Sequence, residues 1–126
     1  MKILIIEDDL YLREPLSKAL RMQGYQVIAA EDGHRAVEIL REEPEVALVI
    51  LDWTLPRMNG GLVFEELRRV CREVKVIIMC GTVYDEVARE FAGRNVSGFL
   101  QKPFRLTELT EAIRLALTSG QPPRPL

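Results

Sequence analysis

The amino-acid sequence predicts an α/β fold in which helices cover both faces of a five-stranded parallel sheet. Short apolar runs alternate with segments of helical spacing five times along the chain. The strongest runs contain no polar residue, as is typical of strands covered on both faces. The 126 residues, 48% of them hydrophobic and 29% charged, match the size and composition of one ordinary globular domain.

Five strands are predicted, and three of them should lie in the centre of the sheet. Ile3–Ile6, Ala47–Leu51 and Val76–Met79 are uninterrupted apolar runs rich in β-branched residues or leucine. Val27–Ala30 and Gly98–Gln101 are more mixed in character, which suits strands nearer the edges.

Five helices are predicted from apolar residues that recur at helical spacing. These residues are Leu12, Leu16 and Leu20; Ala36, Val37 and Leu40; Val63, Phe64, Leu67 and Cys71; Val83, Val87 and Phe91; and Leu106, Leu109, Ile113 and Leu117. Gly24, Pro44 and Gly120 follow the first, second and last helices, where they would end them.

The strict alternation implies right-handed crossovers and a doubly wound three-layer sandwich. With the first, third and fourth strands central, the strand order is 2-1-3-4-5, which is the flavodoxin-like order. A ligand site is then expected at the carboxyl ends of the strands, beside the switch point between strands one and three. Residues 1–119 form the predicted domain, and 120–126 form a proline-rich tail or linker.

Composition excludes several classes of function. The 17 basic and 19 acidic residues give a net charge of −2, so direct binding of nucleic acid is not expected. Two cysteines are too few for a disulfide framework, and no apolar stretch reaches membrane-spanning length. The four apolar residues before Glu7 are too few for a signal peptide, so none is expected. We therefore expect a cytoplasmic protein without a membrane anchor.

Carboxylates stand at the ends of two central strands. Glu7, Asp8 and Asp9 follow the first strand, and Asp52 follows the third, so at least three carboxylates should converge at the switch point. Two like charges about 4 Å apart repel by roughly 4 kcal/mol at an effective dielectric of 20, so the cluster needs a cation or a shifted pKa. Because the donors are all oxygens, Mg²⁺ or Mn²⁺ is expected rather than zinc.

A lysine should reach the same pocket from the fifth strand. Lys102 follows that strand, and its ammonium would hold Asp52 and the oxygens of an anion attached to it. Pro103 would fix the backbone that aims Lys102, and the bond before it is a candidate for the cis form. Cation, carboxylate and lysine together suggest a phosphoryl-transfer site.

Three segments carry a family resemblance. Ile5–Asp9, Asp52–Gly60 and Gly98–Phe104 resemble the motifs of the receiver domain of bacterial two-component response regulators, and each follows a predicted strand. The resemblance covers the chain from Lys2 to about Leu117. The motifs are similar to those of chemotaxis-type receivers and most similar to those of receivers in hybrid histidine kinases.

The resemblance implies a signalling module in a phosphorelay. A histidine kinase or a histidine phosphotransfer domain would donate a phosphoryl group, and the altered domain would regulate a downstream protein that the sequence does not identify. Such a domain catalyses only its own phosphorylation and dephosphorylation, so we do not expect an enzyme in the usual sense.

The resemblance also assigns roles at the acidic site. Asp52 becomes the phosphoacceptor, and Glu7 and Asp8 become the pair that holds the metal together with Asp52. Thr54 would lend its main-chain carbonyl to the metal. Asp9 falls just outside this set and suits a helix N-cap.

Three further residues concern phosphate binding and switching. Lys102 would bind the phosphoryl oxygens, and Phe99 matches an aromatic position whose burial changes on activation, although a plain core role fits Phe99 as well. Cys80 stands where the family has Thr or Ser, which places the switching step, not phosphorylation, in question. Because Cys80 ends an apolar run, it also fits the role of a small buried apolar residue.

Two other functions compete with this interpretation. A haloacid-dehalogenase-type phosphatase also uses an Asp after a strand, but it needs a second Asp where this chain has Thr54, and it needs a cap domain. A receiver that acts as a constitutive interaction module is favoured only by Cys80. Measuring whether a phosphoryl group accumulates on Asp52 would distinguish the two, because only a working receiver should accumulate it. His34, the one histidine, is expected to be exposed and without a role.

Overall fold

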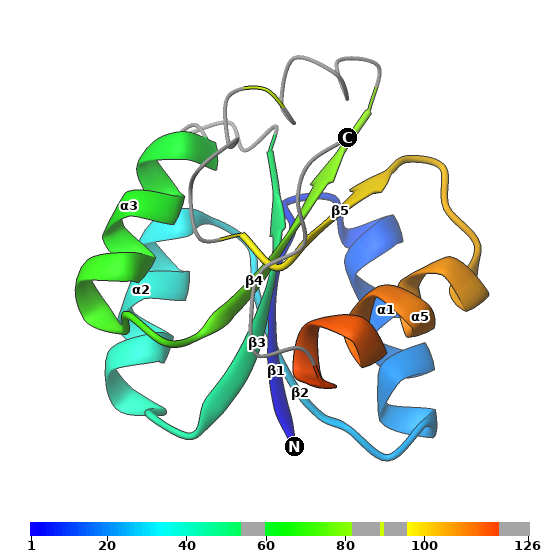
Figure 1. Ribbon diagram of the computed structural model, residues 1–126, viewed down its shortest axis with the longest axis horizontal. Helices are drawn as coiled ribbons and strands as arrows, with labels where there is room; N and C mark the ends of the chain where they lie inside the picture. Colours follow the sequence, from blue (N-terminus) through cyan, green and yellow to red (C-terminus); the bar gives the residue numbers. More distant parts are fainter. Residues whose placement is uncertain (54–59, 82–88, 90–95, 119–126) are drawn as a thin grey trace.

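The computed structural model describes residues 1–53, 60–81, 89 and 96–118, which build one parallel sheet with helices on both faces (Figure 1). The strands are β1 (Lys2–Ile6), β2 (Gln26–Ala30), β3 (Val46–Asp52), β4 (Lys75–Cys80) and β5 (Gly98–Gln101). The helices are α1 (Leu10–Met22), α2 (Gly33–Glu42), α3 (Gly60–Val70) and α5 (Leu106–Thr118). The strand order is β2-β1-β3-β4-β5 with every pair parallel, which confirms the predicted fold class and order.

The strands extend slightly beyond the predicted apolar runs. Asp52 closes β3 and pairs with Met79, and Cys80 closes β4 and pairs with Gln101. Pairing uses only main-chain groups, so a strand continues past the residues whose side chains signal it. The helix predicted around 83–91 and the tail at 120–126 fall outside the described residues, apart from Arg89.

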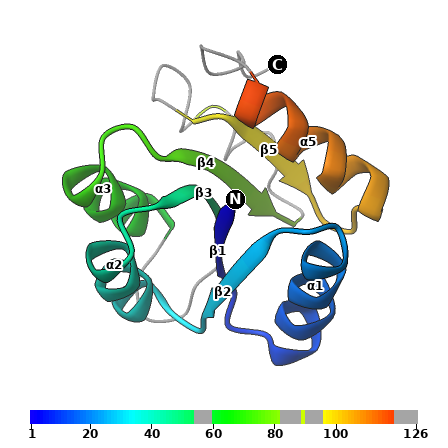
Figure 2. The same cartoon turned by 90° about the horizontal axis from the view of Figure 1, so that it is seen from below.

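Two apolar clusters sandwich the sheet. Ile3 and Ile5 point to the face covered by α1 and α5, whereas Leu4 and Ile6 point to the face covered by α2 and α3. All four side chains are fully buried. Figure 2 shows the two helix pairs on opposite faces of the sheet. We call these the α1–α5 cluster and the α2–α3 cluster, and they explain why the central strands contain apolar residues in both alternating positions.

Short polar and glycine residues set the helix ends. Asp9 caps α1 by accepting a hydrogen bond from the Tyr11 amide at 2.9 Å, and Asp32 caps α2 through the Arg35 amide, also at 2.9 Å. Gly24 follows α1 with φ of 96°, a left-handed conformation that glycine adopts without strain, as predicted for this position. Among the helices that the structure describes, none is both long and apolar enough to cross a membrane.

The central position of β3 makes its apolar residues the most costly to shorten. Ile50→Ala should lower the free energy of unfolding by about 2–5 kcal/mol, because Ile50 is fully buried in the α1–α5 cluster. Leu115→Ala is the control, since Leu115 on α5 is 49% exposed and its loss should change stability by about 0.5 kcal/mol or less. Urea denaturation measures both values, and equal losses would contradict this description of the core.

Candidate functional site

The register of β1 against β3 brings two acidic side chains together. Ile6 pairs with Leu51, so the residues that follow them, Glu7 and Asp52, lie side by side at the carboxyl edge of the sheet. Each is only 1% exposed. This edge is where the order of the strands reverses, the place predicted for a ligand site.

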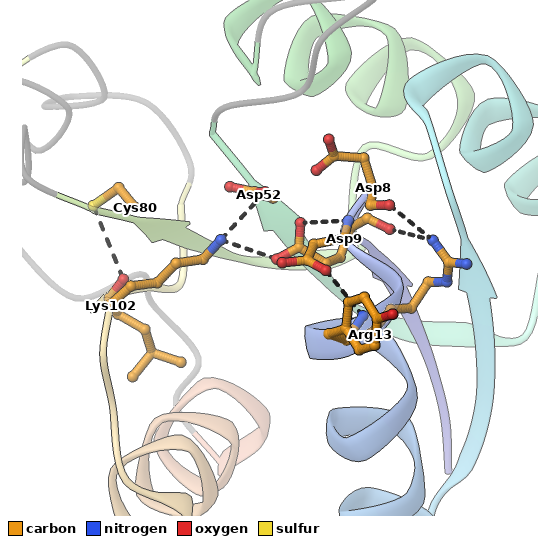
Figure 3. Close-up of polar contacts among 9 residues, drawn as sticks. Asp8, Asp9, Arg13, Asp52, Cys80 and Lys102 are labelled. Carbon is orange, nitrogen blue, oxygen red and sulfur yellow. Dashed lines mark hydrogen bonds and ion pairs between the residues drawn. The ribbon is translucent and has the colours of Figure 1, made fainter.

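Asp8 completes the acidic cluster. It lies just beyond β1 and is exposed, and one carboxylate oxygen from each of Glu7, Asp8 and Asp52 lies within 4.8 Å of the others (Figure 3). Asp9 does not join them, because its carboxylate caps α1, as predicted. Sequence and structure thus agree on which three of the four carboxylates converge.

Lys102 reaches the cluster from the end of β5. Its Nζ atom lies 2.9 Å from Glu7 Oε1 and 3.3 Å from Asp52 Oδ2, so it bridges the two buried carboxylates. The bond between Lys102 and Pro103 is cis, as the sequence suggested. The contact with Asp52 was predicted, whereas the shorter contact with Glu7 was not.

Burial changes the protonation of this site. Burial raises the pKa of Glu7 to about 8, and a hydrogen bond with Asp52 acts in the same direction against the opposing effect of Lys102. For Lys102, burial alone would lower the pKa, but the hydrogen bond to Glu7 and the charge of Asp52 outweigh it and raise the pKa. At neutral pH, therefore, one proton and one ammonium offset much of the negative charge of the cluster.

The donor set fits a hard divalent cation. Three carboxylates supply oxygen ligands, and the exposed Asp8 leaves one side of the cluster open to solvent. The residues that would hold the cation are Glu7, Asp8 and Asp52. Thr54, whose carbonyl was predicted to be a further ligand, lies outside the described residues.

Cys80 lies at the end of β4 and turns away from the carboxylates. Its side chain is fully buried, and its Sγ atom donates a long hydrogen bond of 3.9 Å to the carbonyl of Leu100 in β5 (Figure 3). Burial raises the pKa of this thiol, which favours the unreactive protonated form. Cys80 thus packs as a small apolar core residue, as its position at the end of an apolar run suggested.

Two aromatic residues flank the site without entering the acidic cluster. Phe99 on β5 and Trp53 after β3 are both half-buried and pack against the α2–α3 cluster. The Trp53 amide donates to the carbonyl of Met79 at 2.9 Å, which continues the β3–β4 pairing beyond Asp52. Trp53 thus packs at the edge of the core, next to Asp52 in the chain. His34, by contrast, is exposed at the start of α2, as expected.

A hollow of about 430 Å³ adjoins Lys102 between the start of α1 and the segment after β5. Its lining residues are Asp9, Tyr11, Leu12, Lys102, Pro103 and Phe104. Tyr11 is 89% exposed at its rim. The hollow therefore reaches Lys102, whereas the three carboxylates of the cluster do not line it.

Comparison with known proteins gives a consistent result. The family model described as the response regulator receiver domain matches residues 3–114. The response regulator MprA of Mycobacterium leprae is 36% identical over 124 residues, which cover 97% of this chain and 53% of that protein. The sensor kinase CckA of Brucella abortus is 34% identical over 113 residues, which cover 89% of this chain and 12% of the kinase.

A solved structure supports the same assignment. The crystal structure of a response regulator receiver domain protein from Clostridium thermocellum superposes with a TM-score of 0.86 at 25% identity, covering 92% of this chain and 93% of that one. The chain spans about half the length of the MprA relative.

The buried proton on Glu7 should make the stability of the metal-free protein depend on pH. Between the ordinary carboxyl pKa of 4.5 and about 8, the folded state binds a proton that the unfolded state has lost, so this group makes stability fall as pH rises. Glu7→Gln removes this effect, and it should match the wild type near pH 5 and melt several degrees higher near pH 9.

Thermal unfolding in the presence of a chelator measures this difference. Glu14→Gln, on the exposed face of α1, controls for loss of a carboxylate elsewhere. If the difference in melting temperature between the wild type and Glu7→Gln is the same at both pH values, Glu7 holds no such proton.

Proposed function

Because the chain belongs to the response regulator receiver family, we propose that it accepts a phosphoryl group on Asp52 from a histidine kinase or a histidine phosphotransfer domain. The phosphorylated domain would then regulate a downstream protein. The observation that carries this proposal is the contact of Asp52 with Lys102 inside a cluster of three carboxylates.

The three carboxylates suit different roles. Glu7 follows β1 and lies 2.9 Å from Lys102 Nζ beside the other two carboxylates, which suits a ligand for a cation. Asp8 is exposed and open to a cation from solvent. Asp52 ends β3, contacts Lys102 and matches the phosphoacceptor position of the family, so it is the carboxylate proposed to attack phosphorus.

The transfer itself needs little besides position and charge. An oxygen of Asp52 would form a bond to phosphorus while the bond between phosphorus and the donor imidazole breaks. Lys102 would leave Glu7 and Asp52 to bind the phosphoryl oxygens. Mg²⁺ or Mn²⁺ bound by Glu7, Asp8 and Asp52 would neutralise charge on those oxygens. The domain would thus catalyse only its own phosphorylation and dephosphorylation.

The start of α1 offers a surface for a donor domain. Tyr11 is almost wholly exposed, and Leu10 next to it is 51% exposed, so apolar side chains are available for contact shortly after Asp8 in the chain. The two cysteines are free, which agrees with a reducing cytoplasm as the proposed compartment.

Phosphorylation of Asp52 is the direct test. Incubation with Mg²⁺ and acetyl phosphate or phosphoramidate should add the mass of one phosphoryl group, and Asp52→Asn should abolish this addition. Asp9→Asn is a matched control, because asparagine still caps a helix and Asp9 lies outside the cluster. Intact-mass measurement decides the outcome, and undiminished labelling of Asp52→Asn would exclude Asp52 as the acceptor.

Cys80 should limit the conformational response. In this family a hydroxyl at the Cys80 position moves to bond a phosphoryl oxygen, and the resemblance implies that the Cys80 thiol would have to leave the Leu100 carbonyl to do the same here. Hydrogen bonds to charged groups contribute about 1.5–3 kcal/mol, and 1.4 kcal/mol is tenfold in a population ratio, so a weak thiol donor would leave the active state less populated. Cys80→Ser or Cys80→Thr should therefore enlarge the shift at Phe99 without changing which residue is phosphorylated.

NMR spectra with and without beryllofluoride, which stands in for the phosphoryl group, measure this shift. The Phe99 resonances are the reporter, since Phe99 packs half-buried against the α2–α3 cluster on the strand next to Cys80. A wild-type shift as large as those of Cys80→Ser and Cys80→Thr would show that the thiol suffices.

A further inference from the structure

The Arg13 side chain forms hydrogen bonds with the main chain of Glu7 and Asp8, which carry two of the clustered carboxylates. It lies in the first turns of α1, and its Nη1 atom donates to the main-chain carbonyl oxygen of Glu7 at 2.8 Å and to that of Asp8 at 3.4 Å (Figure 3). Glu7 and Asp8 are the residues whose side chains enter the cluster. One guanidinium thus ties α1 to the chain between β1 and the helix.

Arg13 differs from Lys102 in what it bonds. The Lys102 ammonium contacts carboxylate oxygens of Glu7 and Asp52, whereas the hydrogen bonds of the Arg13 guanidinium go to carbonyl oxygens. Figure 3 shows the two cations on opposite sides of the acidic residues. The arginine therefore holds the backbone without occupying the carboxylate oxygens that a metal needs.

The segment needs such a support. Glu7 still receives a strand-type bond, because its amide donates to the carbonyl of Ala30 at 3.1 Å. Asp8 lies beyond this bond and is exposed, so pairing within the sheet does not fix it. An arginine side chain stays charged at every pH that proteins withstand, and its hold on the carbonyls is independent of the proton on Glu7.

We propose that Arg13 is a positioning residue of the cation site, which sets the affinity for a divalent cation by fixing the main chain of Glu7 and Asp8. The inference takes from the proposed function only the identity of the cluster as the cation site. Groups that orient metal ligands change metal affinity by about 10–100-fold when they are removed. Arg13 acts one step further from the metal, through the backbone of the ligands.

The sign of the effect makes the proposal testable. Removal of a positive charge beside three carboxylates would by itself tighten cation binding. Arg13→Met should instead weaken the binding of Mg²⁺ about tenfold, because the loss of positioning outweighs the loss of repulsion. Arg13→Lys, which keeps the charge and one donor group, should lie between Arg13→Met and the wild type. Titration calorimetry with MgCl₂ measures all three affinities.

Arg21 supplies a matched control on the same helix. Its Nη2 atom donates to the carbonyl oxygen of Val27 in β2 at 3.0 Å, so Arg21→Met also removes a bond from α1 to a strand. It should lower the melting temperature about as much as Arg13→Met does and leave the affinity for Mg²⁺ unchanged. A merely structural role for Arg13 would make the two variants alike.

Amide hydrogen exchange in the absence of Mg²⁺ gives a second measure. Exchange at Asp8 and Asp9 should be faster in Arg13→Met and unchanged in Arg21→Met. Equal or tighter Mg²⁺ binding in Arg13→Met, or unchanged exchange, would overturn the positioning role. A wild-type protein that binds Mg²⁺ but accepts no phosphoryl group would overturn the proposed function and leave the comparison of the two arginines valid.

Discussion

Repulsion among the carboxylates of Glu7, Asp8 and Asp52 is the constraint around which this end of the molecule is built. Charges of one sign a few ångströms apart cost several kcal/mol when solvent is excluded, and two of these three side chains are almost wholly buried. The protein offsets the repulsion with the Lys102 ammonium and with a proton on Glu7. Both offsets are removable, because a cation can replace the proton on Glu7 and the Lys102 ammonium can turn toward another anion.

The order of the strands is what makes this arrangement possible. The β1–β3 register sets Glu7 beside Asp52, and the parallel direction of all strands brings their carboxyl ends to one edge. Lys102 comes from β5, which is separated from β3 by β4, and its long side chain spans that distance. The two apolar clusters stabilise the sheet that holds these groups in place against their mutual repulsion.

Much of the site could be predicted because strand ends are visible in the sequence. Apolar runs located Asp52, Glu7 and Lys102 at strand ends, and topology then placed them together, as the structure shows. A cation or a shifted pKa was predicted for the cluster, but the sequence does not indicate that Glu7 has the raised pKa or that Lys102 contacts Glu7, because both depend on how deeply the side chains are buried. The role of Arg13 was missed because its partners are carbonyl oxygens, which every residue carries. An arginine one turn after a strand-end acidic run is the only signal that was available.

A proton on buried Glu7 stands in for the cation in the metal-free protein, and proton release on metal binding tests this exchange. Titration of the protein with Mg²⁺ at pH 7, in two buffers of different ionisation enthalpy, counts the protons released by calorimetry. About one proton should be released for each Mg²⁺ bound, because a carboxyl whose pKa is near 8 must lose its proton to become a ligand. Binding without proton release would show that no proton on Glu7 occupies the place of the cation.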